Sequence, residues 1–283
     1  MQFEYPWPLG PADGRYTIRE HLGETPSHVL VMRTLGAPER RLLARRRERR
    51  AIAAPPDPPP EPVVTTRATL VDTAALDGHE VASRWLAGAD LATVAGAALA
   101  RLNRVLHAHR IATADPYARE VALAQALVVR VGFGDGERVA EGRWDRAREL
   151  PMPSSGSARA GARGAALRPQ ERLAALLAGR DVALACEELA LRVRLDVDAG
   201  RLREAALGLR VALDATLAEL EPWRDAAGLA GRLVELRERH EAIAAVADVA
   251  LQRGLDEDQI AVVVSVLGRV EAALRARVVG EGL

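Results

Sequence analysis

The sequence predicts an α+β N-terminal domain, with an antiparallel or mixed sheet and two or three helices, followed by an all-α C-terminal helical bundle; helix predominates overall. Three observations carry this prediction. β-rich runs occur only before residue 150, apolar stripes at helical spacing fill residues 169–283, and residues 151–168 have the composition of a flexible linker. Strands grouped before helices are typical of separate α+β and all-α domains. We therefore expect domains at 1–150 and 169–283.

Five segments of the first domain read as strands. Residues 15–21 and 28–35 are rich in Tyr, Ile, Thr and Val, and they flank LGETPS, which suits a hairpin loop. Residues 63–71 form a third β-rich run. Residues 127–133 alternate with the period of a strand, and the glycines that follow predict a second hairpin, with residues 138–144 as its return strand.

The stretch between the third and fourth predicted strands has helical spacing. Residues 90–110 place one apolar stripe on a helix face, formed by Leu91, Val94, Ala98, Leu102, Val105 and His109. Asp115 followed by Pro116 suits the N-cap and first position of a further helix.

Two segments have the composition of linkers. Residues 53–62, AAPPDPPPEP, are expected to run extended as polyproline II, because proline lacks an amide donor and fixes φ. Residues 151–165, PMPSSGSARAGARGA, are rich in Gly, Ser and Ala and are expected to be flexible. We place the main domain boundary in the second segment.

Five long amphipathic helices are predicted after this boundary, and the short turns between them favour antiparallel packing into a bundle. They cover about 169–179, 181–198, 201–221, 226–252 and 256–279. Asp181 and Asp256 are the expected N-caps, Gly200 and Gly254 mark helix ends, and Pro222 stops the third helix. The second helix is expected to turn four side chains inward, Val182, Leu189, Val193 and Val197.

One part of the bundle resembles a known family. Residues 185–217 read ACEELALRVRLDVDAGRLREAALGLRVALDATL, and their order is similar to the turn and second helix of a tetratricopeptide repeat, through Gly200, Leu202, Glu204, Ala205, Ala212 and Leu213. The resemblance implies a helical hairpin whose small alanines allow close packing, in a family of protein-binding scaffolds. It covers 33 residues, lacks the family's aromatic in the first helix and its closing proline, and has no second copy at a period of 34 residues. A generic helical hairpin is the alternative.

The composition excludes several classes of enzyme. The chain has no lysine, and all 39 of its basic side chains are arginine. A P-loop, a protein kinase and a Schiff-base or pyridoxal-phosphate enzyme each need a lysine, and arginine does not lose its proton in a protein. The single cysteine, Cys186, cannot form an internal disulfide or a zinc site alone and is expected to be a core residue.

Charge and hydropathy give the expected compartment. The 39 acidic side chains balance the arginines, so no overall field attracts nucleic acid or a membrane. The uncharged stretches reach about ten residues, whereas a membrane span needs roughly twenty. The N-terminus is not typical of a signal peptide, so a cytoplasmic protein without a membrane partner is expected. Residues 169–283 carry 15 arginines against 20 acids, a net charge of −5.

No catalytic, cofactor-binding or metal-binding residue is predicted. Residues 132–136, GFGDG, would need a following helix to bind phosphate, and a hairpin turn is expected there instead. His107 and His109 diverge on a helix and do not suit a ligand pair. Arg237 stands three residues before His240, so the Glu-x-x-His pattern of a di-iron bundle fails.

Two segments are candidate partner contacts. Residues 40–50, RRLLARRRERR, could bind nucleic-acid phosphates or an acidic partner through Arg40, Arg41, Arg45, Arg46, Arg47, Arg49 and Arg50. Near the N-terminus, Phe3, Tyr5 and Trp7 alternate along an extended segment, which either packs on its own domain or inserts into a partner.

These observations favour a non-enzymatic intracellular protein-interaction or regulatory protein that uses the acidic helical domain to bind a protein partner or a second copy of itself. One alternative is a nucleic-acid-associated protein that binds through residues 40–50. A second alternative is an enzyme with an unrecognised site in the N-terminal domain, for which the candidate residues are His79, His107, His109 and Asp115.

Overall fold

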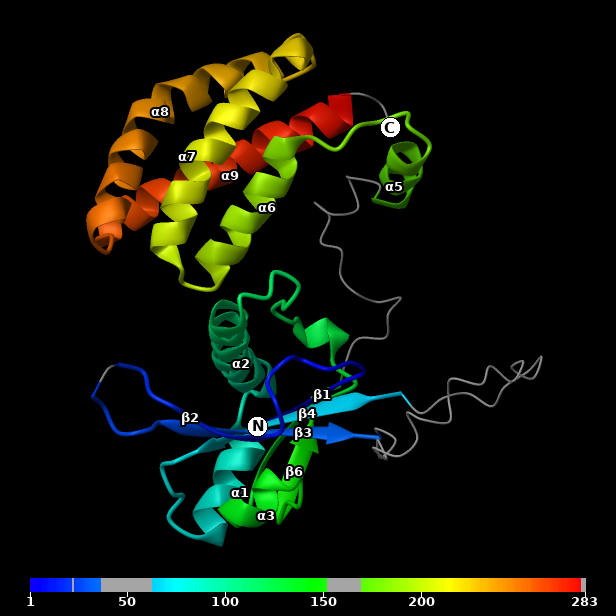
Figure 1. The fold of residues 1–283 in the computed structure, drawn as a ribbon, viewed down its shortest axis with the longest axis vertical. Helices are drawn as coiled ribbons and strands as arrows, with labels where there is room; N and C mark the ends of the chain where they lie inside the picture. Colours follow the sequence, from blue (N-terminus) through cyan, green and yellow to red (C-terminus); the bar gives the residue numbers. More distant parts are fainter. Residues whose placement is uncertain (22, 37–62, 152–168, 281–283) are drawn as a thin grey trace, which may run out of the picture. The chain divides into compact units, whose positions relative to one another are not determined.

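A computed structural model describes residues 1–21, 23–36, 63–151 and 169–280. Its contacts divide the chain into two compact units, Met1–Ser157 and Ala158–Leu283. The described strands all belong to the first unit, and the described part of the second unit is helical (Figure 1). Helix predominates at 56% against 15% strand, so the predicted fold class is confirmed.

The N-terminal unit is built on a six-stranded antiparallel sheet with the order β2-β3-β4-β1-β5-β6. The strands are β1 (Gln2–Tyr5), β2 (Gly14–Ile18), β3 (His28–Leu35), β4 (Thr65–Asp72), β5 (Val128–Phe133) and β6 (Arg146–Glu149). The first strand in the sequence therefore lies at the centre of the sheet, paired with β4 on one edge and β5 on the other.

Two helices cover apolar side chains of the sheet. The long helix α2 (Leu91–Thr113) lies over it (Figure 1) and packs Leu102 and Leu106 in one cluster with Phe3, Tyr5 and Leu30. The shorter α1 (His79–Gly88) packs Ala82 and Leu86 in a second cluster with Val131 and Phe133 of β5. The strand alternation predicted for β5 is confirmed, because Val129, Val131 and Phe133 are buried.

The return strand of the second hairpin was predicted at the wrong residues. Residues 138–144 contain no strand, and the partner of β5 is β6, which begins at Arg146. Asp135 is the N-cap of a short helix, α3 (Gly136–Ala140), and its carboxylate accepts a hydrogen bond from the Glu137 amide at 3.4 Å. This cap, together with the positive φ of 80° at Gly142, forms a helical turn before the chain returns to the sheet.

The helix predicted after Asp115 is also absent. The Asp115 carboxylate accepts a hydrogen bond from the Tyr117 amide at 2.9 Å, which is typical of a local turn formed by aspartate. The chain then reaches β5 through a single 3₁₀ turn, η2 (Leu123–Gln125).

The second unit contains the five predicted helices. They are α5 (Pro169–Leu177), α6 (Ala185–Asp198), α7 (Leu202–Glu219), α8 (Leu229–Gln252) and α9 (Glu257–Gly280), with a 3₁₀ turn, η3 (Glu221–Trp223), after α7. Helices α6 to α9 enclose one core, with fully buried side chains that include Leu209, Leu213, Leu233, Leu236 and Leu267. As predicted, Asp256 caps α9, exchanging hydrogen bonds with Gln259 at 2.9 and 3.1 Å.

The start of α6 differs from the prediction. The helix begins at Ala185 rather than at Asp181, and Val182 is 54% exposed instead of turned inward. The Glu187 carboxylate accepts from the Leu184 amide at 3.1 Å, and Glu219 of α7 accepts from the Cys186 amide at 2.9 Å. These two carboxylates satisfy first-turn amides that have no partner within the helix.

Helices α6 and α7 pack as a hairpin, the arrangement expected from either interpretation of residues 185–217. Its turn contains Gly200, whose φ is 72°, in the left-handed region. Along the hairpin, a Cβ added to Gly208 would lie 3.0 Å from Val193 Cγ2, so a small residue is needed where the two helices approach.

We expect Gly200→Val to destabilise the helical unit by at least about 1 kcal/mol, because a β-branched residue is strained at positive φ. Urea unfolding of the full chain, followed by circular dichroism at 222 nm, measures this change. A suitable control is Gly231→Ala within α8, where an added Cβ meets open space and the higher helix propensity of alanine should stabilise slightly. Equal stability of Gly200→Val and the parent would show that the turn does not need glycine.

A buried ionic cluster joins the segment before α6 to α9. Arg277 and Asp181 have side chains that are each 1% exposed, and the arginine donates to the carboxylate at 2.6 Å. Arg172 of α5 donates to the same Asp181 at 3.1 Å and to Glu187 at 2.6 Å. The guanidinium of Arg277 also lies 4.7 Å from the centre of the Trp223 ring, within the range of a cation–π interaction.

In the described parts of the chain, no single helix is long and apolar enough to cross a membrane. Helices α1 and α2 meet that criterion only as a pair, across a bend of 100°.

Candidate ligand cavity in the N-terminal unit

The N-terminal unit contains a cavity of about 870 Å³ that lies just beyond the Met1 end of β1. The strand β1 pairs Gln2 with Thr69 of β4 and with Arg130 of β5, and Met1 is the last residue on that line. Both neighbours continue beyond it, to Asp72 on β4 and to Phe133 on β5. The cavity is lined by these extensions and by residues of α1 and α2, and it lies beyond Met1 between the ends of β4 and β5.

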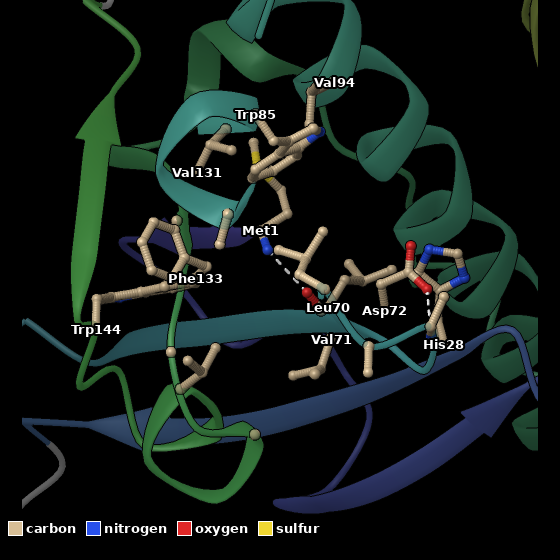
Figure 2. Close-up of a pocket in the computed structure, with 18 of the residues that line it drawn as sticks. Met1, His28, Leu70, Val71, Asp72, Trp85, Val94, Val131, Phe133 and Trp144 are labelled. Atoms are coloured by element: carbon tan, nitrogen blue, oxygen red, sulfur yellow. Dashed lines mark hydrogen bonds between the residues drawn. The ribbon is translucent and has the colours of Figure 1, made fainter. Parts of the chain in front are cut away.

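On β4, the backbone of Asp72 faces this position. In an antiparallel ladder, alternate residues turn both backbone groups to the same neighbour. The Leu70 amide donates to the Met1 carbonyl at 2.7 Å, and the Leu70 carbonyl accepts from the Met1 amino group at 2.8 Å (Figure 2). Asp72, two residues further along, therefore turns its N–H and C=O toward the cavity.

On β5, the backbone of Gly132 faces the same position. The carbonyl of Val129 accepts from Leu150, and the carbonyl of Phe133 accepts from Asp145, so both point toward β6. By the same alternation, Gly132 turns its N–H and C=O toward the cavity. The position is thus flanked on both sides by backbone groups that can form hydrogen bonds.

Aromatic side chains line the cavity on both faces of the sheet. On the face of Val131 and Phe133 lies Trp85 of α1, which is 40% exposed (Figure 2). On the opposite face, the Trp144 ring covers Gly132 so closely that an added Cβ would lie 2.7 Å from it. The absence of a side chain at Gly132 therefore makes room for the indole.

One part of the cavity is lined by polar and charged side chains, His28, Asp72 and Arg101. Asp72 stands opposite His28 in the pairing of β3 and β4, and its carboxylate accepts from the Ala74 amide at 2.9 Å. Burial lowers the pKa of His28, which is therefore neutral at pH 7. The nearby Arg101 donates to Glu20 at 3.3 Å, and the same carboxylate accepts from Arg104 at 2.8 Å.

The inner end of the cavity is the amino group of Met1. Burial lowers its pKa to about 5, although the charge of Asp72 acts in the opposite direction. A neutral amine is therefore the main form at pH 7 in the empty cavity. Such a group can take up a proton when a negative charge is placed beside it.

The aromatic residues singled out near the N-terminus lie in the core. Phe3 and Tyr5 are fully buried on β1, and the Tyr5 hydroxyl donates to the Ala122 carbonyl at 3.4 Å. Trp7 is partly buried, with its ring 5.5 Å from that of Tyr5. Packing within the N-terminal unit accounts for their alternation.

The four candidate residues of the enzyme alternative do not all line this cavity. His79 does, with its ring edge-on to Phe133 at 5.1 Å. His107 lies 3.8 Å from Glu120, and His109 packs against Gly10. Among the described residues, no group of three or more His, Cys, Asp or Glu side chains could hold a metal ion.

The structure can be compared with three other predictions made from the sequence. The GFGDG segment is followed by a helix, contrary to the prediction, but α3 has only five residues. Cys186 is a buried core residue as predicted, and burial raises the pKa of its thiol to about 12. His240 Nε2 lies 2.7 Å from Asp214 Oδ1, at an exposed site. The arginines at 40–50, the proline-rich segment 53–62 and the linker 152–168 lie outside the described residues.

Of the residues that line the cavity, the sequence analysis singled out His79 as a candidate site residue and missed the others discussed here. Met1, His28, Asp72, Trp85 and Trp144 are far apart in the sequence and follow no motif spacing. The strand pairing of the sheet, the packing of α1 on β5 and the loop before β6 bring them together.

Comparison with protein-family models, with curated proteins and with solved structures finds no match to this chain.

Proposed function

We propose that this chain is a non-enzymatic protein-interaction or regulatory protein, and that its N-terminal unit binds an extended segment of a partner as an added strand. The observation that carries the proposal is the cavity beyond Met1, which the ends of β4 and β5 line on either side. Strand addition gains affinity from main-chain hydrogen bonds and specificity from pockets for alternate side chains. Here the backbone groups of Asp72 and Gly132 can form the main-chain hydrogen bonds. The aromatic side chains on the two faces of the sheet can form the pockets for alternate side chains.

The size and lining of the cavity support binding rather than catalysis. Ligand sites commonly measure roughly 300–1,000 Å³ and have mostly apolar walls with a few polar groups. Here the walls contain Trp85, Phe133 and Trp144, and the polar lining includes His28, Asp72 and Asp145. The Ser27 hydroxyl lies 3.0 Å from Nδ1 of the lining residue His28, but Ser27 itself does not line this cavity.

The acidic helical unit is a second candidate partner surface, as the sequence analysis expects. Leu191 and Leu195 of α6 are 67% and 47% exposed, and their spacing of four places them on one helix face. Exposed ion pairs flank this face, Glu188 with Arg192 at 2.8 Å among them. An apolar strip with a polar rim is typical of a protein interface. The nucleic-acid alternative and the cytoplasmic compartment stay predictions.

The proposed strand addition predicts that linear peptides bind the full chain at the cavity. Peptides enriched from a displayed library, presented both internally and with free carboxyl ends, can be measured by fluorescence anisotropy. Ala97→Trp should weaken them at least about tenfold, because Ala97 is an exposed lining residue of α2 and the indole would fill the mouth. Ala100→Trp, on the same helix but outside the lining, should leave binding unchanged.

Two outcomes would contradict this proposal. One is that no linear peptide is enriched on the folded chain. The other is that enriched peptides bind Ala97→Trp as tightly as the parent. If the paired substitutions Leu191→Asn and Leu195→Asn abolish that binding instead, the helical unit is the partner surface.

A further inference from the structure

The strand β2 has an outer edge that the described residues leave unpaired. It is the first strand in the order of the sheet and pairs only with β3 among the described strands. The Ile18 carbonyl accepts from the Ser27 amide, just before β3, at 2.9 Å. Because alternate residues turn both backbone groups to the same neighbour, Arg15 and Thr17 turn theirs away from β3. The turn, loop and cap hydrogen bonds of the described residues include none to these groups.

The strand at the other edge of the sheet, β6, is followed by a residue that opposes further pairing. The Leu150 amide donates to the Val129 carbonyl of β5 at 2.8 Å, so Pro151 beside it faces outward. Proline has no amide donor, and natural sheets use it at edges to prevent pairing with another chain. Residues 13–19, which contain β2, include no proline. The outer edge of β2 therefore keeps the donors and acceptors that a further strand needs.

We propose that two copies of this chain pair through their β2 edges, antiparallel and centred on Tyr16, so that their two sheets become one. In this register Arg15 of one copy lies opposite Thr17 of the other, and the two residues exchange their N–H and C=O groups. A two-fold axis relates the copies, so each contact forms twice. None of these residues lines the cavity, so the inference goes beyond the proposed function and does not depend on it.

The charges that flank β2 select this register. Asp13 and Arg19 stand just before and just after the strand, and both are exposed. Pairing centred on Tyr16 places Asp13 of each copy opposite Arg19 of the other, at both ends of the interface. Opposite charges in such cross-strand pairs stabilise a sheet, and like charges directly opposite each other destabilise it.

Other arrangements of the two strands bring like charges together. A shift of two residues in one direction would place Arg15 opposite the second copy's Arg15. The same shift in the other direction would place Arg15 opposite Arg19. Parallel pairing in register would place Asp13 beside Asp13 and Arg19 beside Arg19. The edge is therefore complementary to itself in one direction and one register.

The side chains of the strand itself suit the pairing on both faces of the sheet. On one face, the guanidinium of Arg15 donates twice to the Glu137 carboxylate, at 2.8 and 2.6 Å, so its charge already has a partner within the same copy. On the other face, the half-buried Tyr16 side chains of the two copies meet at the centre of the interface. They form a non-hydrogen-bonded pair, the position where opposite side chains lie closest and aromatic pairs are favourable.

The test is sedimentation velocity of the full chain from micromolar to submillimolar concentrations, so that every segment of the chain can compete for the edge. The average mass should rise reversibly from that of one chain toward that of two. Asp13→Arg and Arg19→Asp should each weaken self-association at least about tenfold, because both ends of the interface then carry like charges. A matched control is Glu24→Arg, which makes the same change of charge at an exposed site outside the paired residues and should leave association unchanged.

Mixing the two variants gives a readout that a folding defect does not imitate. In a dimer of one Asp13→Arg chain and one Arg19→Asp chain, an acid again lies opposite an arginine at both ends. Association of the equimolar mixture should therefore return to the level of the parent. Hydrogen exchange gives the register, since the Arg15 and Thr17 amides of the parent should exchange more slowly as its concentration rises. The Tyr16 amide, which faces β3, should not change in this way.

Three results would overturn the inference. They are a parent chain that stays monomeric at every concentration, a dimer that Asp13→Arg does not weaken, and a mixture of the two variants that associates no better than either alone. If Leu191→Asn with Leu195→Asn abolishes the dimer while Asp13→Arg leaves it intact, the second copy binds the helical unit and the β2 interface is refuted.

Discussion

Replacing Arg277 with methionine should lower the stability of the helical unit by about 3–5 kcal/mol, the cost of removing one partner of a buried ion pair. Arg277 and Asp181 are each 1% exposed, so the carboxylate that remains is poorly solvated and keeps Arg172 as a charged partner. The variant also loses the cation–π contact with Trp223. Urea unfolding of the full chain, followed at 222 nm, measures the change.

Arg210→Met is the matched control for this prediction. Arg210 donates to Asp248 at 3.0 Å, but the two side chains are 46% and 64% exposed. Such a pair is screened by solvent, and its loss should cost less than about 1 kcal/mol. Equal effects of the two substitutions would show that the buried pair contributes no more than a surface pair.

The effect of Arg277→Met should also depend on pH in a defined direction. Burial acts to raise the pKa of Asp181, but hydrogen bonds from Arg277 and Arg172 outweigh it, and the net pKa is lowered from 3.8. The stabilisation is therefore fully present above the pKa of an unfolded aspartate and is lost as the pH falls through the lower folded value. Parent and variant should converge in stability in acid.

Replacing Phe3 with alanine should destabilise the N-terminal unit by about 3–5 kcal/mol, because the ring is fully buried and its removal leaves a cavity in the core. Phe3 lies on the central strand, so the loss affects packing beneath α2 as well as in the sheet. Urea unfolding gives the magnitude, and hydrogen exchange of the full chain shows which unit opens.

Tyr117→Ala is the control for Phe3→Ala. Tyr117 is 84% exposed, and its removal should change stability by less than about 0.5 kcal/mol. A Phe3→Ala chain as stable as the parent would show that the aromatic alternation of the N-terminus is not explained by core packing. An interaction with a partner would then become the favoured explanation.

Local signals in the sequence were enough for most of the secondary structure. The alternation of residues 127–133, the glycine at 200 and the cap at Asp256 each concern neighbours within a few residues, and β5, the α6–α7 turn and α9 follow them. The predictions failed where a competing local bond was overlooked. Asp135 caps a short helix and Asp115 closes a turn, because aspartate serves equally well in both settings.

The candidate cavity could not be predicted in this way. It depends on which strands become neighbours, and the pairing of β1 joins residues separated by 67 positions on one side and by 128 on the other. Hydrophobic alternation predicts that a strand has a buried face, but it does not name the strands beside it. The contact between Arg277 and Asp181 could not be predicted from a local pattern either, because the two residues are 96 positions apart.

The sequence by itself determined the fold class, the order of strands before helices, the absence of lysine chemistry and most of the helix boundaries, because these depend on composition and on local periodicity. Only the tertiary structure decided that the first strand lies in the middle of the sheet and that its two neighbouring strands extend beyond it. The tertiary structure also decided that the buried Arg277 binds Asp181 and so joins the first and last parts of the helical unit. These features come from long-range pairing and packing, in which many side chains must be satisfied at once and no short segment carries the information.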